Sequence, residues 1–311
     1  MIDQTAAGTQ ARPPAPTAAN ARPREIEEPL NWYFVHPMSR ALVKLLIPTG
    51  ISPNTVSALG VVMAALAATS YAGVAWPWNA VIGLGFHIAW HVFDGADGQL
   101  ARATGKTSTY GEIVDGVCDH LSHLVLYVVV AVVLTPSLGV WAWVLTAGAL
   151  ASRALQATSY ETTRRNYRRW VYSLNWIRQD LDKAATVAKP GPLGAFGVAL
   201  AGTYLKLSEQ VRADDRAIDA AMTRLTRHSG PKAEAARALY REAELPMVHR
   251  AAWLSTNYET AAMAMSFLAG SPIYFVVFEL TVLNLVLAAS VIGQGRSYAR
   301  LLPRLEALDA S

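Results

Sequence analysis

Apolar residues gather into six long segments of this chain, with polar residues between them. A helix needs about 20 mostly apolar residues to cross a bilayer, and each segment is close to that length. The segments cover residues 54–74, 77–100, 112–134, 139–160, 251–270 and 272–293. This pattern predicts an all-α fold class, a polytopic membrane protein with six transmembrane helices.

The composition agrees with that fold class. Only 16% of the 311 residues are charged and 52% are hydrophobic, whereas soluble domains average about 25% charged residues. The net charge of +4 is too small to indicate a nucleic-acid partner. The single cysteine, Cys118, excludes an internal disulfide framework.

The first 50 residues divide into two parts. Residues 1–26 are rich in Ala, Pro and Thr and lack the apolar core of a signal peptide, so we expect a disordered tail. In residues 27–50, aromatic and basic side chains interleave along NWYFVHPMSRALVK (31–44). This arrangement predicts an N-terminal helix lying in the membrane interface, and a plain soluble helix is the alternative.

Charged residues distinguish the two sides of the predicted bundle. The connections on one side, residues 71–79, 135–141 and 269–274, carry no charge. Connections on the other side are basic and include the run RRNYRR at 164–169. By the positive-inside rule the basic side is cytoplasmic, and both termini lie there.

Residues 161–250 form a long insertion between the fourth and fifth predicted spans. It contains two helical patterns, DDRAIDAAMTRLTRH (214–228) and PKAEAARALYREAEL (231–245). Residues 191–207 are apolar but short, which suits an interfacial helix, a re-entrant segment or the core of a cytosolic subdomain. We favour the subdomain or the interfacial helix, because a seventh span would reverse the topology of everything after it.

The predicted organisation therefore has four parts. They are the tail (1–26), the interfacial helix with spans one to four (27–160), a cytosolic or interfacial helical insertion (161–250), and spans five and six with a C-terminal tail (251–311).

Four aspartates lie at the cytoplasmic edge of spans two and three, in DGADGQLARATGKTSTYGEIVDGVCDH (94–120). Asp94 and Asp97 are three residues apart and Asp115 and Asp119 four apart, so each pair shares one face of its helix. The connection between the helices is short, which makes them antiparallel neighbours. The two carboxylate pairs are therefore expected to converge.

Bare carboxylates do not cluster, because two like charges 4 Å apart repel by about 4 kcal/mol at an effective dielectric near 20. They must be protonated, spread apart or neutralised by cations. Hard divalent cations prefer oxygen ligands, and two such metals can clamp a diphosphate. A carboxylate at the edge of the site can act as general base. The stretch therefore predicts a site for two divalent metals, Mg²⁺ or Mn²⁺, in phosphate chemistry.

Small residues accompany the aspartates. Gly95, Gly98 and Gly111 each cost about 1 kcal/mol in a helix relative to alanine. Their lack of a side chain lets a flat ring or a diphosphate approach the backbone, and Arg102 offers a bidentate phosphate contact. The alternative is close packing of membrane helices, which leaves the aspartates unexplained.

These residues resemble the signature of the CDP-alcohol phosphotransferases, also called CDP-alcohol phosphatidyltransferases. The signature D-x-x-D-G-x-x-A-R-x8-G-x3-D-x3-D is matched at every specified position, by Asp94, Asp97, Gly98, Ala101, Arg102, Gly111, Asp115 and Asp119. Six transmembrane helices with cytosolic termini also agree with that family. The resemblance covers residues 27–165, and the last two helices by hydropathy alone.

The resemblance implies an integral-membrane enzyme of phospholipid or related head-group synthesis. It would transfer a phosphoalcohol group, such as phosphatidyl, from CDP-diacylglycerol or another CDP-linked donor to an acceptor alcohol. CMP would be released, and two divalent metals would be required. The membrane lipid is a further partner, and the oligomeric state stays open, a homodimer being one candidate.

The resemblance also implies roles for individual residues. The metal ligands would be Asp94, Asp97, Asp115 and Asp119, and Asp119 would also be the base. The CDP site would be lined by Gly98, Ala101, Arg102 and Gly111. Asn54 is a further nucleotide-side candidate, because SPNTVS (52–57) resembles the element that opens the first helix in this family. A helix N-cap is the alternative role for Asn54.

The sequence says less about the acceptor alcohol than about the metal and nucleotide sites. SYETTR (159–164) partly resembles the Ser-Tyr-x-Lys-Ala-Arg element of members that use phosphorylated polyols, but Thr162 replaces the lysine. Arg153, Arg164 and Arg165 could still form an anion pocket, and the alternative for Arg153 is snorkelling or pairing with Glu161. The N-terminal sequence instead resembles members that transfer phosphocholine or phosphoethanolamine to diacylglycerol. The two indications conflict.

Other polar residues of the predicted spans are expected mainly to pack. His91 and His123 lie one turn outside the aspartate pairs and suit hydrogen-bonded packing or support of the site. The last two spans contain three polar residues that line the acceptor pocket or pair between helices, namely Glu259, Glu279 and Asn284.

Two other functions are compatible with intramembrane aspartates. The first is a divalent-cation transporter or channel, but no carboxylates continue clearly through spans two and three. The second is a catalytically silent scaffold that works through the insertion, and the complete set of motif residues argues against it.

Overall fold

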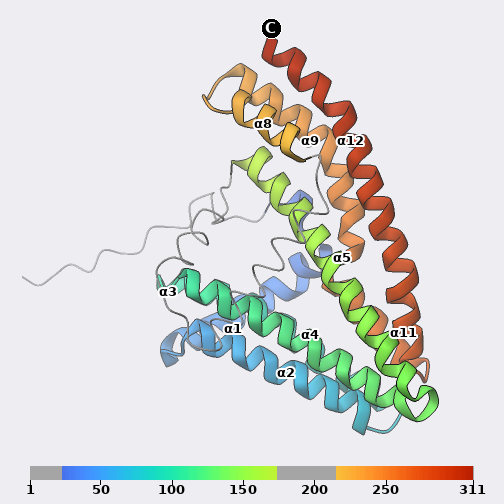
Figure 1. Cartoon of the computed structure of the whole chain (residues 1–311). Coiled ribbons are helices and arrows are strands. Elements are labelled where there is room, and N and C mark those ends of the chain that lie inside the picture. Colours follow the sequence, from blue (N-terminus) through green and yellow to red (C-terminus); the bar gives the residue numbers. More distant parts are fainter. Residues whose placement is uncertain (1–22, 174–214, 311) are drawn as a thin grey trace, which may run out of the picture.

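The computed structural model describes residues 23–173 and 215–310, and every regular element within these ranges is helical. The all-α fold class is therefore confirmed. The helices are α1 His36–Leu46, α2 Pro53–Gly73, α3 Trp78–Thr104, α4 Thr109–Leu138, α5 Val140–Tyr172, α8 Asp215–Leu225, α9 Pro231–Ala251, α10 Thr256–Leu268, α11 Ile273–Phe278 and α12 Asn284–Ala310 (Figure 1).

Short turns connect or extend several of these helices. Three are 3₁₀ turns, at Arg24–Ile26, Ile47–Thr49 and Ala252–Leu254. Two are π-helical turns, at Asn31–Val35 before α1 and Glu279–Leu283 between α11 and α12.

Local capping residues define the helices that carry the aspartates. The hydroxyl of Ser52 accepts the backbone N–H of Thr55 at 3.2 Å and caps α2. The chain leaves α3 at Gly105, which has a positive φ of 67°. Ser108 then caps α4 by accepting the N–H of Gly111 at 3.0 Å. These closely spaced stop and start signals make α3 and α4 antiparallel neighbours.

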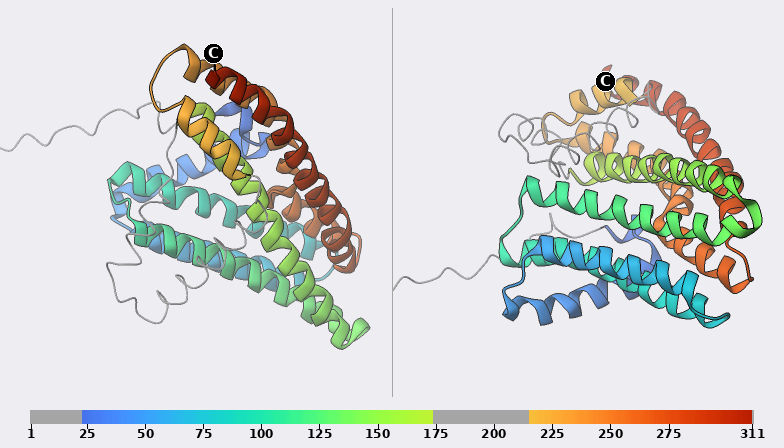
Figure 2. Two further views of the ribbon diagram at one scale, coloured as in Figure 1. Left: turned by 45° about the horizontal axis from the view of Figure 1, so that its top comes forward. Right: turned by 60° about the horizontal axis from the view of Figure 1, so that its bottom comes forward.

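The helices form two groups (Figures 1 and 2). In the first group α2 packs on both α3 and α4, and α1 lies along α3. In the second, α12 packs on α9 and α8, and α9 packs on α5. The two groups meet where α4 packs on α5.

Each group has its own apolar core. The first is centred on α2, α4 and α10, with buried residues that include Tyr71, Tyr127, Met263 and Phe275. The second joins α5, α8, α9 and α12 through residues that include Tyr167, Met222, Tyr240 and Leu301. Burying such large side chains stabilises each group by about 1.5–3 kcal/mol per residue.

α1 approaches α3 very closely at a glycine. A Cβ atom on Gly95 would lie 2.7 Å from the Oγ of Ser39, so a larger residue there would push α1 away. The hydroxyl of Ser39 donates to the backbone carbonyl of Val92 at 2.9 Å. Gly95 therefore holds the N-terminal helix against the helix of the first two aspartates.

Three stretches of the described chain are long and apolar enough to cross a membrane, Pro53–Gly73, Ile113–Leu138 and Ile273–Ala310. The other predicted spans are helical over α3, α5 and α10. α10 has 13 residues and is only about 20 Å long. Six spans and their orientation stay a prediction.

The structure also bears on the predicted segment boundaries. The end of the predicted tail is ordered, since Arg24–Ile26 form a turn and Ile26 is buried in the second core. α5 continues past residue 160 to Tyr172. Both helical patterns of the insertion form helices, α8 and α9. Residues 1–22 and the apolar stretch 191–207 lie outside the described residues.

Candidate active site

The first aspartate pair lies near the C-terminal end of α3. Asp97 is buried, whereas Asp94, one helical turn earlier, is exposed. The Oγ of Ser57, on α2, donates to Asp97 Oδ2 at 2.5 Å, and the backbone N–H of Gly98 also contacts the Asp97 carboxylate. These two donors hold the carboxylate of Asp97 in one orientation.

The second pair lies on α4 and faces the first. The Asp115 carboxyl interacts electrostatically with Asp94, Asp97 and Asp119. Ionised carboxylates have only acceptor atoms, so such close carboxylates repel one another unless protons or cations neutralise them. The structure therefore brings all four predicted aspartates into one electrostatic cluster.

The chemistry of this cluster fits divalent metals. It supplies up to eight carboxylate oxygens, the donors that Mg²⁺ and Mn²⁺ prefer. In the described part of the chain, no group of three His, Cys, Asp or Glu side chains has the geometry of a metal site. The assignment of the aspartates as metal ligands stays a prediction.

The predicted nucleotide-side residues border the aspartates. The guanidinium of Arg102 lies beside Gly98, where an added Cβ would come within 3.3 Å of its Nη1. A Cβ on Gly111 would lie 3.5 Å from the Oδ1 of Asn54. Because Ser52 caps α2, the alternative of an N-cap role for Asn54 is wrong. Asn54 therefore projects toward the start of α4.

Sequence reasoning missed Ser57 as a residue of the site. It lies at the end of the SPNTVS element, from which only Asn54 was selected. The missing information was that α2 packs with this face against Asp97. The hydroxyl of Ser57 on the largely apolar helix α2 was the feature of the sequence that could have indicated its role.

A buried polar chain extends from Asp119 into the bundle. His123 Nδ1 lies 3.8 Å from Asp119 Oδ1, and its Nε2 lies 3.2 Å from Glu259 Oε2 on α10. Glu259 in turn pairs with the Nε of Arg153 at 2.7 Å. Both side chains of this pair are almost fully buried, 4% exposed for Arg153 and 1% for Glu259. These contacts link Asp119 to the buried pair of Glu259 and Arg153 inside the bundle.

Arg153 therefore neither snorkels nor pairs with Glu161, and both alternatives are wrong. Its Nη1 donates to the carbonyl of Leu254 at 2.7 Å and its Nη2 to Thr256 Oγ1 at 2.8 Å. A fully buried cation needs such a set of partners. Glu259, which supplies the charge, comes from a distant helix that sequence spacing could not identify.

Two of the other polar residues of the spans pair between helices. His91 Nε2 lies 2.7 Å from Thr260 Oγ1. Asn284 accepts from Gln156 at 3.2 Å and donates to Ser152 at 3.0 Å. Glu279 differs, because it is buried and neither of its carboxylate oxygens has a hydrogen-bond partner among the described residues. Its place in an acceptor pocket stays a prediction.

The remaining predicted arginines lie farther along α5. Arg164 pairs with Glu27 at 2.9 Å and with Glu161 at 3.7 Å. Arg165 donates to Thr162 Oγ1 at 3.2 Å. The structure thus spreads Arg153, Arg164 and Arg165 along one helix and gives each a protein partner. Their role as an anion pocket stays a prediction.

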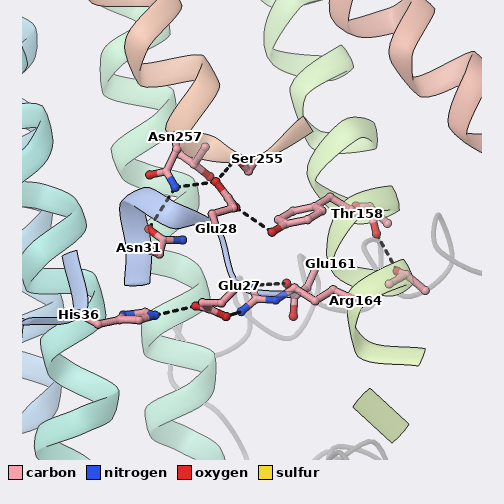
Figure 3. A network of polar contacts seen from close by, with 12 residues as sticks. Glu27, Glu28, Asn31, His36, Thr158, Glu161, Arg164, Ser255 and Asn257 are labelled. Atoms are coloured by element: carbon pink, nitrogen blue, oxygen red, sulfur yellow. Dashed lines mark hydrogen bonds and ion pairs between the residues drawn. The ribbon is translucent and has the colours of Figure 1, made fainter. Parts of the chain in front are cut away.

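The N-terminal segment supplies acidic partners to these helices (Figure 3). The Glu28 carboxylate accepts from Tyr160, Ser255 and Asn257 at 2.7, 2.7 and 2.6 Å. Glu27 lies between Arg164 and His36 (Figure 3). This network could not be predicted from the sequence, because residues 27 and 28 belong to a segment expected to lie in the interface.

Comparison with known proteins places the aspartates in a family context. A family model for CDP-alcohol phosphatidyltransferases matches residues 50–221, more than half of the chain. A search of curated proteins found no match. The matched range contains all four aspartates, the supporting Ser57 and the three candidate arginines Arg153, Arg164 and Arg165.

Proposed function

Because the chain belongs to the CDP-alcohol phosphatidyltransferase family, we propose that it is an integral-membrane enzyme of phospholipid or related head-group synthesis. Family membership makes it a transferase of substituted phosphate groups that moves a phosphoalcohol group from a CDP-alcohol. The observation that carries the proposal is the meeting of four motif aspartates from α3 and α4.

In this proposal Asp94, Asp97, Asp115 and Asp119 hold two divalent cations, Mg²⁺ or Mn²⁺. Two cations held there would supply positive charge to the diphosphate of the donor and to the departing CMP. Ser57 keeps the Asp97 carboxylate oriented toward this centre through its 2.5 Å hydrogen bond.

The remaining steps use residues of the chain itself. Asp119 accepts the proton of the acceptor hydroxyl, whose oxygen bonds to the phosphorus that carries the alcohol. The bond from that phosphorus to the CMP oxygen breaks, and CMP leaves. Arg102 and Asn54 border the nucleotide, and the glycines at 98 and 111, with Ala101, leave room for it against the backbone.

The membrane placement supports the same proposal. The aspartates lie toward the ends of α3 and α4 that adjoin the α3–α4 connection, where Arg102 of α3 and Lys106 of the connection are basic. With that side cytoplasmic, a soluble nucleotide reaches the site from the cytosol and a lipid approaches from the bilayer. Six spans with both termini in the cytosol give this arrangement.

A screen for CMP release tests the function. Purified protein with Mg²⁺ or Mn²⁺ is incubated with CDP-diacylglycerol or soluble CDP-alcohols, each paired with candidate acceptors. We expect acceptor-dependent release of CMP from one donor class. Metal flux into proteoliposomes without nucleotide turnover would contradict the proposal and favour a cation transporter.

A further inference from the structure

The carboxylate of Glu27 joins two helices from opposite groups of the fold (Figure 3). Its Oε1 lies 2.6 Å from the Nε2 of His36 on α1, and its Oε2 accepts from the Nη2 of Arg164 on α5 at 2.9 Å. The Glu27 side chain is only 1% exposed. It is therefore an enclosed counter-ion of Arg164 and not a passing surface contact.

Arg164 has further partners besides Glu27. A second carboxylate, Glu161, lies 3.7 Å from its Nη1. The guanidinium lies 5.9 Å from the centre of the Tyr160 ring, within cation–π range. Only 13% of the Arg164 side chain is exposed. The positive charge of Arg164 is thus compensated inside the protein.

The lysine position of this element carries no cation here, and the adjacent Arg165 donates to Thr162 Oγ1 at 3.2 Å. Thr162 occupies the place of the lysine in the element that resembles polyol-phosphate users, and its hydroxyl donates to the carbonyl of Thr158 at 2.7 Å. Arg153, two turns earlier, is paired with Glu259. A phosphate entering here would meet paired arginines and two carboxylates.

This ion pair adjoins the helices of the candidate active site. α1, which carries His36, is fastened to α3 by the Ser39–Val92 hydrogen bond and lies against Gly95, the neighbour of Asp94. α5 packs on α4, the helix of Asp115 and Asp119. Glu27 therefore bridges the two elements that flank the aspartate helices.

We propose that Glu27 is a specificity-determining residue: by occupying Arg164, it restricts the enzyme to an uncharged alcohol acceptor and excludes phosphorylated polyols. The inference rests on the proposed phosphoalcohol transfer. A phosphorylated acceptor would have to displace a buried carboxylate that His36 also holds, and like-charge repulsion opposes its approach. The position of Thr162 and the pairing of Arg164 point to the same acceptor class.

The test measures anion binding without catalysis. Full-length protein in detergent is unfolded thermally with divalent metal chelated, in glycerol 3-phosphate or in potassium chloride of equal ionic strength. The wild type is expected to unfold at the same temperature in both. The variant Glu27→Gln removes the charge of the nearer carboxylate and leaves Arg164 with only the more distant Glu161, at 3.7 Å. It should gain a saturable rise in Tm of about 2–4 °C with glycerol 3-phosphate.

Matched variants show whether the rise in Tm depends on Arg164. The double variant Glu27→Gln/Arg164→Gln should lose it, and Glu25→Gln, two residues away on the same segment, should behave like the wild type. No gain in a folded Glu27→Gln protein would overturn the proposal. If Glu27→Gln does not fold, the wild type decides: saturable stabilisation by glycerol 3-phosphate that Arg164→Gln removes would overturn the proposal, and its absence would support it.

The CMP-release assay separates this inference from the function on which it rests. With its donor, the wild type should use a neutral alcohol at least about tenfold faster than the phosphate ester of that alcohol, and Glu27→Gln should narrow this ratio. A tenfold ratio corresponds to about 1.4 kcal/mol. Preferred use of the phosphate ester would overturn the inference alone, whereas absence of CMP release with any acceptor would overturn the proposed function.

Discussion

Two groups of acidic residues lie among the helices of this protein, and they differ in their partners. The four aspartates of α3 and α4 interact with one another, with the hydroxyl of Ser57, with the nearby Arg102 and, through Asp119, with His123. The three glutamates of the N-terminal segment are each surrounded by donors. Glu25 binds two tyrosines and Arg241, Glu27 binds His36 and Arg164, and Glu28 binds Tyr160, Ser255 and Asn257.

We expect this difference to separate a binding site from a structural joint. A buried carboxylate with a full set of donors stabilises the fold and has no capacity left for a ligand. A cluster of carboxylates repels itself unless protons or cations neutralise it. Acidic residues alone therefore do not mark a site, and the arrangement of their neighbours has to be considered.

The largest expected effect is on catalysis by the aspartate cluster. Asp119→Asn removes the general base but keeps an oxygen ligand, so CMP release should fall by about 10²–10⁴-fold with metal binding largely retained. Turnover is measured with saturating donor, and metal binding by thermal shift. Unchanged CMP release would contradict the assignment of Asp119 as the base.

Substitutions in the N-terminal glutamates should lower the stability of the protein rather than its turnover. Glu28→Ala leaves three donors without their acceptor, one of them the buried Tyr160 hydroxyl, and should lower the free energy of unfolding by about 3 kcal/mol. Denaturant unfolding in detergent measures the loss. The exposed Glu242, whose carboxylate pairs with Arg304 at 3.2 Å, provides the control, because Glu242→Ala should change stability by about 0.5 kcal/mol or less.

Divalent metal should distinguish the two groups directly. Mg²⁺ or Mn²⁺ at about 100 times its Kd should stabilise the wild type by about 2.7 kcal/mol, because it relieves repulsion among the carboxylates. Thermal unfolding with and without a chelator measures the shift. Asp94→Asn/Asp115→Asn should lose it, while Glu28→Gln should keep it. Equal stabilisation of all three proteins would argue against a metal site at the aspartates.

A smaller effect is expected from the residue that orients Asp97. Ser57→Ala removes the 2.5 Å hydrogen bond and should lower turnover by about 10-fold. Ser57→Thr, which restores a hydroxyl, should recover most of the loss. If Ser57 served packing alone, alanine and threonine would change stability without this pattern in turnover.

The smallest effect concerns pH and Glu25. Burial raises its pKa, but hydrogen bonds from Tyr172, Tyr167 and Arg241 outweigh burial and hold the pKa of Glu25 below its usual value. Its contribution to stability is therefore present above the usual carboxylate pKa of about 4.3 and is lost as pH falls through the lower folded-state value. As the pH falls from about 5 to the pH at which the protein unfolds, the free energy of unfolding of the wild type should therefore fall more than that of Glu25→Gln.

Local features of the sequence determined the helices and the pairing of the aspartates on them. Ser52, Gly105 and Ser108 start and stop the helices through bonds to residues only a few positions away. The spacing of Asp94 with Asp97, and of Asp115 with Asp119, places each pair on one helical face because the helical period is local. The family signature could be identified for the same reason, since it lies within one helix–turn–helix.

Only the tertiary structure decided which charges are compensated. Tyr160 donates to Glu28 across 132 residues of sequence, and Arg164 to Glu27 across 137. Nothing in the spacing of these residues indicates a contact, because helix packing brings them together over long separations. The same packing buries Arg153 against Glu259 and places Ser57 on Asp97. The sequence by itself thus determined where the acidic residues lie on their helices, and the packing of those helices decided which partners each of them has.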